Sequence, residues 1–185
     1  MAAMSADRLA SGYFRLGTQY YVSARAATIA GLFPVCGNLF HHAIELFLKG
    51  DLSATVSAAK LKQGFSHRLP SLWLEFKTNH PDRRVDAFTG AIAALDAFEH
   101  IRYPDNILAE GAYGTVSFGP FVPHFHSPTP PPPGYHLVVA DLDAIVALIF
   151  ELSSVNPAFY FGSLGAEAKA ALLHNNRTFN SKHCA

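Results

Sequence analysis

The chain has 185 residues, enough for one domain of ordinary size, and half of them are hydrophobic while 15% are charged. This balance excludes a largely disordered chain, which would carry more charge and too little apolar surface to form a core. The 14 basic and 14 acidic side chains give a formal net charge of zero at pH 7, and we expect no duplex DNA as a partner because duplex-binding surfaces need a basic excess.

The first predicted helix begins at a capping residue, Ser5 or Asp7, and runs to about Ile29. Gly31 ends this helix, and Pro34 favours the start of the next one. The apolar face of the first helix consists of residues that recur at helical spacing, namely Leu9, Tyr13, Leu16 and Tyr20.

The second predicted helix follows Pro34, ends at Gly50 and has the clearest apolar face of the chain. On the opposite side, Glu45 and Lys49 lie one turn apart and form a favourable pair. His41 and His42 share this polar side, which we expect to be solvated or part of an interface. The apolar face comprises Leu39, Phe40, Ala43, Ile44, Phe47 and Leu48.

Two further helices are predicted in the next fifty residues. The third helix has Pro70 in its first turn and closes at Asn79-His80-Pro81. The fourth begins at Asp82 and ends before Tyr103-Pro104-Asp105. Their inner faces are formed by Leu69, Leu72, Trp73 and Phe76, and by Val85, Phe88, Ile92, Leu95 and Ile101.

The segment from 106 to 136 is rich in glycine and proline and differs in composition from the helical parts of the chain. Residues 113–118 and 135–139 are short and β-prone, so we expect a small β-hairpin or a loop insertion here. The prolines at 130–133 favour a stiff surface loop over a ligand for an aromatic groove.

The helical pattern resumes at Asp141, a good N-cap, and continues to Asn156-Pro157. A last short helix is expected from about Gly165 to His174, followed by a polar tail over 175–185. Taken together, the predicted elements indicate an all-α fold whose helices form a bundle within a single domain, residues 1–185.

The cysteines and the apolar stretches bear on the cellular compartment. Cys36 and Cys184 are too few for a disulfide framework and favour unlinked thiols in a reducing environment. The first seven residues lack the apolar part of a signal peptide, and the longest aliphatic stretch, Ala144 to Phe150, is too short to cross a bilayer. We therefore expect a cytoplasmic protein without a membrane partner.

Three short segments lie in or next to the second, third and fourth predicted helices. They are Ala43-Ile-Glu-Leu-Phe-Leu-Lys49 in the second helix, His67-Arg-Leu-Pro-Ser-Leu72 at the third, and Arg102-Tyr-Pro-Asp105 after the fourth. This order of motifs resembles the HEPN family of helical bundles, whose members often carry A-x-E-x-x-L-K, H-x-L-x-x-L and R-Y-P-D there. The similarity covers residues of about 8 to 105, and the helix over 141–155 would be the closing helix of the family.

The resemblance implies an up-and-down bundle of about five to six helices, usually dimeric and associated with nucleotides, RNA or nucleotidyltransferase partners. Active ribonucleases of the family carry an arginine followed, after four to six residues, by a histidine. Arg102 is the matching arginine, but the positions for the histidine hold Ile107, Leu108 and Ala109. This departure argues against ribonuclease chemistry at this place.

The candidate ligand-binding residues include basic side chains near these motifs. Arg102 could bind a phosphate through its forked guanidinium, or it could pair with Asp105 and tie a helix end to its turn. His67 could meet a phosphate or cap the third helix. The full candidate set is Arg102, Asp105, His67, His100 and Lys49.

Ten histidines also raise the question of a metal site. His41 and Glu45 lie one helical turn apart, and His124 and His126 would face the same side of a strand. A usable site needs three or four ligands, so further histidines would have to come from elsewhere in the chain. We expect no metal and no other cofactor, with these four residues as the weak metal candidates.

Three functions are open at this point. The leading hypothesis is a dimeric, non-catalytic HEPN-like module that binds a nucleotide, RNA or a protein partner. The second is a ribonuclease that uses Arg102 with a displaced histidine such as His100 or His126. The third is a metal-dependent hydrolase built on the histidines.

Overall fold

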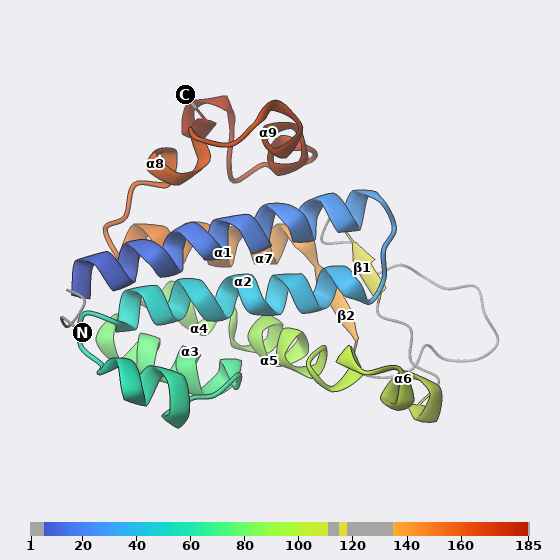
Figure 1. Ribbon diagram of the computed structural model, residues 1–185, viewed down its shortest axis with the longest axis horizontal. Helices are drawn as coiled ribbons and strands as arrows, with labels where there is room; N and C mark the ends of the chain where they lie inside the picture. Colours follow the sequence, from blue (N-terminus) through green and yellow to red (C-terminus); the bar gives the residue numbers. More distant parts are fainter. Residues whose placement is uncertain (1–5, 111–114, 118–134, 185) are drawn as a thin grey trace, which may run out of the picture.

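Three long helices form the centre of the structure, a computed structural model that describes residues 6–110, 115–117 and 135–184. They are α1 (Ala6–Ile29), α2 (Val35–Leu52) and α7 (Val139–Leu152). Helices α1 and α2 run antiparallel and side by side, and α7 lies behind them (Figure 1). Phe14, Phe47 and Phe150, one from each helix, meet in the interior with ring centroids 5.1–5.7 Å apart.

Shorter helices lie on both sides of this centre. One group lies on the side of α2 that faces away from α1, and a second group lies on the side of α1 that faces away from α2 (Figure 1). The first group comprises η1 (Lys60–Gly64), α3 (Leu69–Asn79), α4 (Arg83–Asp86), α5 (Thr89–Ala97), η2 (His100–Arg102) and α6 (Pro104–Glu110). The second comprises α8 (Pro157–Phe161), α9 (Ala166–Leu173) and η3 (Ser181–Cys184).

The all-α prediction is confirmed, and the inner faces follow the predicted periodicity. In α3 the buried side chains are the four that were expected, and Phe47 of α2 and Ile92 of α5 are buried as well. Burial of one such side chain contributes about 1.5–3 kcal/mol to the free energy of unfolding. The amphipathic pattern therefore determines which helix faces form the core.

Two three-residue strands are present, but they do not form the predicted hairpin. Strands β1 (Thr115–Ser117) and β2 (His136–Val138) pair in parallel, with Val116 opposite Leu137. A hairpin requires antiparallel strands, so of the two predicted alternatives, a hairpin or a loop insertion, the hairpin is wrong, although each β-prone segment contains a strand. The prolines at 130–133 lie outside the described residues.

Gly50 does not end the second helix as expected, because α2 continues to Leu52. The glycine is needed instead for close packing of α1 on α2. A Cβ at Gly50 would lie 2.8 Å from Cδ2 of Phe14, and a Cβ at Gly17 would lie 2.8 Å from Cε1 of Phe47. Glycine at these two positions lets the helix backbones approach each other closely.

The predicted fourth helix is divided into shorter elements. Asp82 caps α4 as expected, accepting a hydrogen bond from the Arg84 backbone, but the backbone of Phe88 leaves the helical region (φ −98°, ψ 1°) before α5 begins. Pro104 starts α6 rather than ending helical structure, so residues 106–110 of the expected insertion are helical. Helix α7 begins two residues before Asp141, which lies in its first turn.

A buried arginine joins the second group of short helices to the centre. Arg25 of α1 is fully buried and donates to both carboxylate oxygens of Asp143 in α7, each at 2.6 Å. Its remaining hydrogen bonds go to the carbonyl oxygens of Ala171, at 3.1 Å, and His174 near the end of α9.

The prediction of a polar tail over 175–185 is only partly correct, since Phe179 beyond α9 is buried and packs on Phe161.

Two further sequence predictions concern the cysteines and the membrane. Cys36 and Cys184 are both buried and unlinked, as expected. Among the helices of the described residues, none combines the length and the apolar character that crossing a bilayer requires.

We predict that Gly37→Ala destabilises the protein, because the new Cβ would lie 2.0 Å from Cδ1 of Phe98, a buried ring. Overpacking of this kind costs about 1–3 kcal/mol. Gly12→Ala is the matched control, since Gly12 lies within α1 and has nothing within 4 Å of the new Cβ. The gain in helix propensity should then stabilise this variant by up to about 1 kcal/mol. Urea unfolding of both variants measures the difference, and equal stabilisation by both would contradict the packing of Phe98 on α2.

Candidate functional site around Glu45

The polar side of α2 is buried, contrary to the expectation of a solvated or interfacial face. His41 is fully buried, and Glu45 and Lys49 are only 4% and 7% exposed. The residues before α3 cover this side, because the backbone oxygens of Ser66 and His67 accept hydrogen bonds from Lys49 and His41. Polar side chains of α2 thus anchor a loop that is about twenty residues further along the chain.

Glu45 is the centre of a network of charged and polar side chains. Its Oε1 accepts a hydrogen bond of 2.6 Å from Nζ of Lys49, which confirms the predicted pair. Its Oε2 lies 3.1 Å from Nδ1 of His67 and 3.4 Å from Nδ1 of His42. Because a carboxylate only accepts, these ring nitrogens carry the hydrogen when the contacts are hydrogen bonds.

The surroundings of Glu45 stabilise its charged form. Burial alone would raise the pKa of its carboxyl group, but the hydrogen bonds from His42, Lys49 and His67 and the positive charge of Lys49 outweigh that effect. The result is a pKa lowered from the ordinary 4.5 to about 2. Glu45 is therefore a carboxylate at every pH above that value, and it provides a fixed negative charge inside the protein.

His41 holds the loop rather than a ligand. Its Nε2 donates to the backbone oxygen of His67 at 2.9 Å, and its buried Nδ1 has no hydrogen-bond partner. Burial lowers the pKa of His41, although the negative charge of Glu45 opposes this shift. A neutral ring with its hydrogen on Nε2 fits both observations.

Arg102 lies at a solvent-exposed edge of the structure, where it pairs with Glu99. Its Nη1 donates to Oε1 of Glu99 at 3.0 Å, and its guanidinium lies 5.6 Å from the ring centre of Tyr103, a residue that is 57% exposed. The hydrogen bond that Arg102 donates to Glu99, together with the negative charge of Glu99, raises the pKa of Arg102, and the more distant charge of Glu45 adds a smaller effect. Arg102 therefore presents a permanent positive charge beside an exposed aromatic ring.

The other ligand-binding candidates are placed differently from the sequence expectations. The ion pair of Arg102 is with Glu99 rather than with Asp105, which is exposed in the first turn of α6. His67 does not cap α3, because Oδ1 of Asp96 accepts the hydrogen bond from the Leu69 backbone instead. Lys49 is occupied by Glu45 and Ser66, so it has a structural role.

His100 lies in η2 and is exposed, two residues before Arg102. Its backbone oxygen accepts a hydrogen bond of 2.6 Å from the side chain of Asn106. This bond links η2 to α6.

One group of potential metal ligands is formed within the described residues. The ligand-type atoms of His42, Glu45 and His67 all lie within 4.8 Å of one another. Of the weak metal candidates only Glu45 belongs to this group, since His41 is bound to the loop backbone, and His124 and His126 lie outside the described residues. His42 was not among the metal candidates, although its place three residues before Glu45 on one helix face is a signal that sequence inspection can detect.

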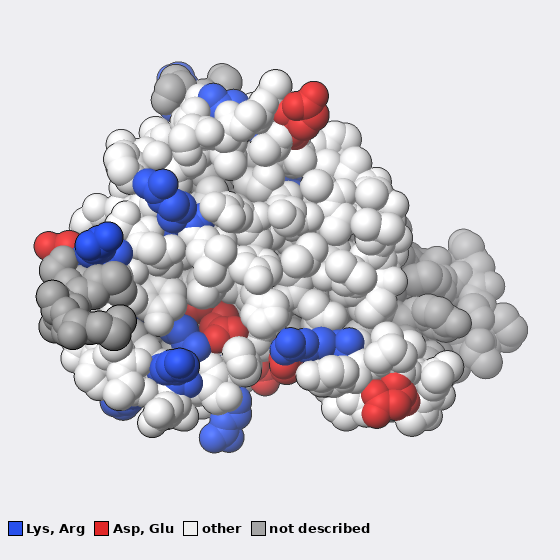
Figure 2. Space-filling model, in the orientation of Figure 1, with Lys and Arg blue, Asp and Glu red and all other residues white. Residues whose placement is uncertain are grey.

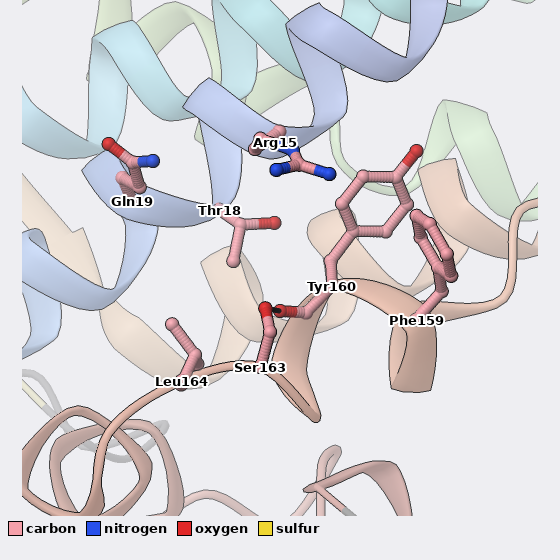
Figure 3. Close-up of a pocket in the computed structure, with 7 residues that line it drawn as sticks. All are labelled: Arg15, Thr18, Gln19, Phe159, Tyr160, Ser163 and Leu164. Carbon is pink, nitrogen blue, oxygen red and sulfur yellow. Dashed lines mark hydrogen bonds between the residues drawn. The ribbon is translucent and has the colours of Figure 1, made fainter.

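A pocket between α1 and α8 was not predicted from the sequence (Figure 3). Its volume is about 170 Å³, and the guanidinium of Arg15 points toward the ring of Tyr160 across it. The buried hydroxyl of Thr18 is already bonded to the Phe14 carbonyl, and that of Ser163 donates to the Tyr160 carbonyl at 3.1 Å. The lining residues are Arg15, Thr18, Gln19, Phe159, Tyr160, Ser163 and Leu164.

The surface charge agrees with the neutral composition. On the face shown in Figure 2, Lys and Arg side chains are interspersed with Asp and Glu and separated by uncharged surface. A continuous basic band of the kind that follows a duplex backbone is absent from the described residues of that face. Local sites such as the Arg102 edge are therefore better candidates for anion binding than the surface as a whole.

Comparisons with known proteins assign neither a family nor a function to the chain. No protein-family model, no curated protein and no solved structure matches the chain. The functional reading therefore depends on the residues themselves and on the resemblance of their motifs to the HEPN family.

We predict that Lys49→Met destabilises the protein by about 3–5 kcal/mol, because the change leaves the buried carboxylate of Glu45 without its cationic partner. Lys60→Met is the matched control, since the Lys60 ammonium is 56% exposed and lies 3.6 Å from Glu75 in an ordinary surface ion pair. This variant should change the free energy of unfolding by less than about 1 kcal/mol. Chemical denaturation at pH 7 measures both values. A similar small effect of the two substitutions would mean that Glu45 does not rely on Lys49.

Proposed function

We propose that the chain is a single HEPN-like domain, an up-and-down helical bundle that acts as a non-catalytic binding module for a phosphate-bearing ligand, either a nucleotide or RNA. The observation that carries this proposal is the meeting of motif residues at one buried carboxylate. Glu45 and Lys49 come from the first motif and His67 from the second, and the side chains of Lys49 and His67 both contact the carboxylate of Glu45. Arg102 of the third motif pairs instead with Glu99.

This convergence supports the resemblance in a way that the separate motifs do not. Short motifs occur by chance, but chance matches have no reason to contact one another after folding. Here His67 lies 22 residues after Glu45, and their side chains are 3.1 Å apart. The first and second motifs therefore belong to one structural unit.

The Arg102 edge has the chemistry that a phosphate-bearing ligand requires. A guanidinium binds phosphate oxygens through paired hydrogen bonds, and that of Arg102 is 40% exposed. The neighbouring ring of Tyr103 offers a surface on which a nucleobase can stack. The exposed ring of His67 adds a further hydrogen-bonding group beside the same network.

We propose a module without catalytic activity because the histidine expected shortly after Arg102 is missing. The positions that would supply it hold Ile107, Leu108 and Ala109, none of which can transfer a proton. We further propose, from the resemblance, a cytoplasmic homodimer with a nucleotidyltransferase-type protein as a partner. Size-exclusion chromatography with light scattering tests the dimer, for which a mass of twice the 20.0 kDa chain is expected.

We predict that a nucleoside phosphate binds to the purified protein and that Arg102→Ala weakens this binding about tenfold or more, since a charged hydrogen bond contributes about 1.5–3 kcal/mol. Isothermal titration with mono-, di- and triphosphates of adenosine and guanosine measures the affinity. Arg83→Ala is the control, because Arg83 is an exposed arginine of α4 outside the Glu45 network, and it should leave the affinity unchanged.

Two outcomes would contradict the proposal. Equal loss of affinity in Arg102→Ala and Arg83→Ala, or no binding of any nucleotide or of single-stranded RNA, would remove Arg102 as the binding residue. Cleavage of RNA by the protein that is lost in Arg102→Ala and in His100→Ala would show the ribonuclease of the second hypothesis instead.

A further inference from the structure

We propose that His42, Glu45 and His67 form a binding site for one divalent transition-metal ion of the zinc class. The three side chains come from α2 and from the loop before α3, and their ligand-type atoms lie within 4.8 Å of one another. This inference goes beyond the proposed nucleotide-binding function and does not depend on it.

The distances from Glu45 to the two histidines match those between ligands of a tetrahedral ion. Zinc binds nitrogen and carboxylate oxygen at about 2.0–2.1 Å, so two ligands on a tetrahedron are separated by about 3.3 Å. The Oε2 atom of Glu45 lies 3.1 Å from Nδ1 of His67 and 3.4 Å from Nδ1 of His42. The ligand atoms of the two histidines also lie within 4.8 Å of each other, so rotation of the two rings toward a common centre would let the three atoms hold one ion.

For the ion to bind, the ring hydrogen of His42 and of His67 must move from Nδ1 to Nε2. This change of tautomer leaves the net charge of each neutral ring unchanged. In the metal-free protein each Nδ1 points its hydrogen at Glu45. To bind the ion, each Nδ1 must offer its lone pair, so the single ring proton of each histidine moves to Nε2 through solvent. His67 is 53% exposed at its side chain and His42 is 25% exposed, which gives solvent access for this exchange.

Other side chains already hold the three ligands in place. Lys49 occupies the other carboxylate oxygen, so Oε2 is the one that remains for the ion. His41 fixes the backbone of His67 through its carbonyl oxygen, and the ring of Tyr20 lies 5.5 Å from that of His42. Such outer contacts orient metal ligands and contribute to affinity.

The donor set determines which ions fit. Two imidazole nitrogens and one carboxylate oxygen suit Zn²⁺, Co²⁺ or Ni²⁺, whereas Mg²⁺ and Ca²⁺ prefer oxygen ligands alone. Lys49 beside Glu45 offsets the carboxylate charge, so we expect weaker binding than at a structural zinc site. Three protein ligands leave a fourth position on the exposed side of His67 for water.

The test uses the full chain without an affinity tag, stripped of metal by a chelator that is then removed. Titration with Zn²⁺ against a chromophoric competitor should show one ion per chain. Titration with Co²⁺ should give the visible absorption bands of a tetrahedral site with nitrogen and oxygen ligands. His67→Ala should weaken Zn²⁺ binding by roughly 100-fold or more, since even the loss of an outer contact costs about 10–100-fold.

Control variants keep the test decisive. His183→Ala removes a histidine in η3, away from the cluster, and should leave the Zn²⁺ affinity unchanged. His67 is the preferred position because its side chain is 53% exposed, against 25% for His42, and circular dichroism checks that the His67→Ala variant is folded. His42→Ala removes a second proposed ligand and should also weaken Zn²⁺ binding. If that variant does not fold, the result for His67→Ala alone decides the test.

Two results would overturn the metal site. They are the absence of stoichiometric Zn²⁺ binding, and binding that His67→Ala and His183→Ala leave equally intact. Nucleotide titration of the chelator-treated protein separates this inference from the proposed function. Nucleotide binding without Zn²⁺ binding would overturn the metal site alone, and Zn²⁺ binding without any nucleotide or RNA binding would overturn the proposed function alone.

Discussion

The buried contact between Glu45 and Lys49 is the constraint on which the candidate site depends. Moving a carboxylate and an ammonium out of water costs several kcal/mol for each ion, so such a pair persists only when its remaining hydrogen-bonding capacity is used. Here the loop before α3 meets that requirement, because His67 contacts the free carboxylate oxygen and Ser66 accepts from the ammonium. The pair therefore determines where this loop lies on α2, and with it the start of α3.

The same network divides the motif residues into an inner and an outer set. Lys49 of the first motif and His41 just before that motif are buried and hold the loop, whereas Arg102 and His67 reach solvent. A ligand that approaches from solvent thus meets the outer set, in which His67 is held by the inner residues and Arg102 by Glu99. The nucleotide proposal and the metal inference use this outer set at two different places, the guanidinium of Arg102 and the imidazole of His67.

Sequence periodicity predicted the helices and their apolar faces well, because burial of Phe47, Trp73 and Ile92 follows from helical spacing alone. It did not predict what covers the polar face of α2, since the covering loop is about twenty residues away and spacing carries no information on such contacts. Gly50 was misread as a helix end because its close approach to Phe14 is a tertiary contact. The parallel pairing of β1 and β2 was missed for the same reason.

The most direct test of this account is the titration of the Glu45 carboxyl group, followed by carbon-13 NMR and assigned by the loss of its signal in Glu45→Gln. A carboxylate that accepts from Lys49, His67 and His42 should titrate with a pKa of about 2, well below the ordinary 4.5. A Glu45 that titrates near 4.5 would show that the motif residues do not meet at this carboxylate in solution, and the site built on it would be wrong.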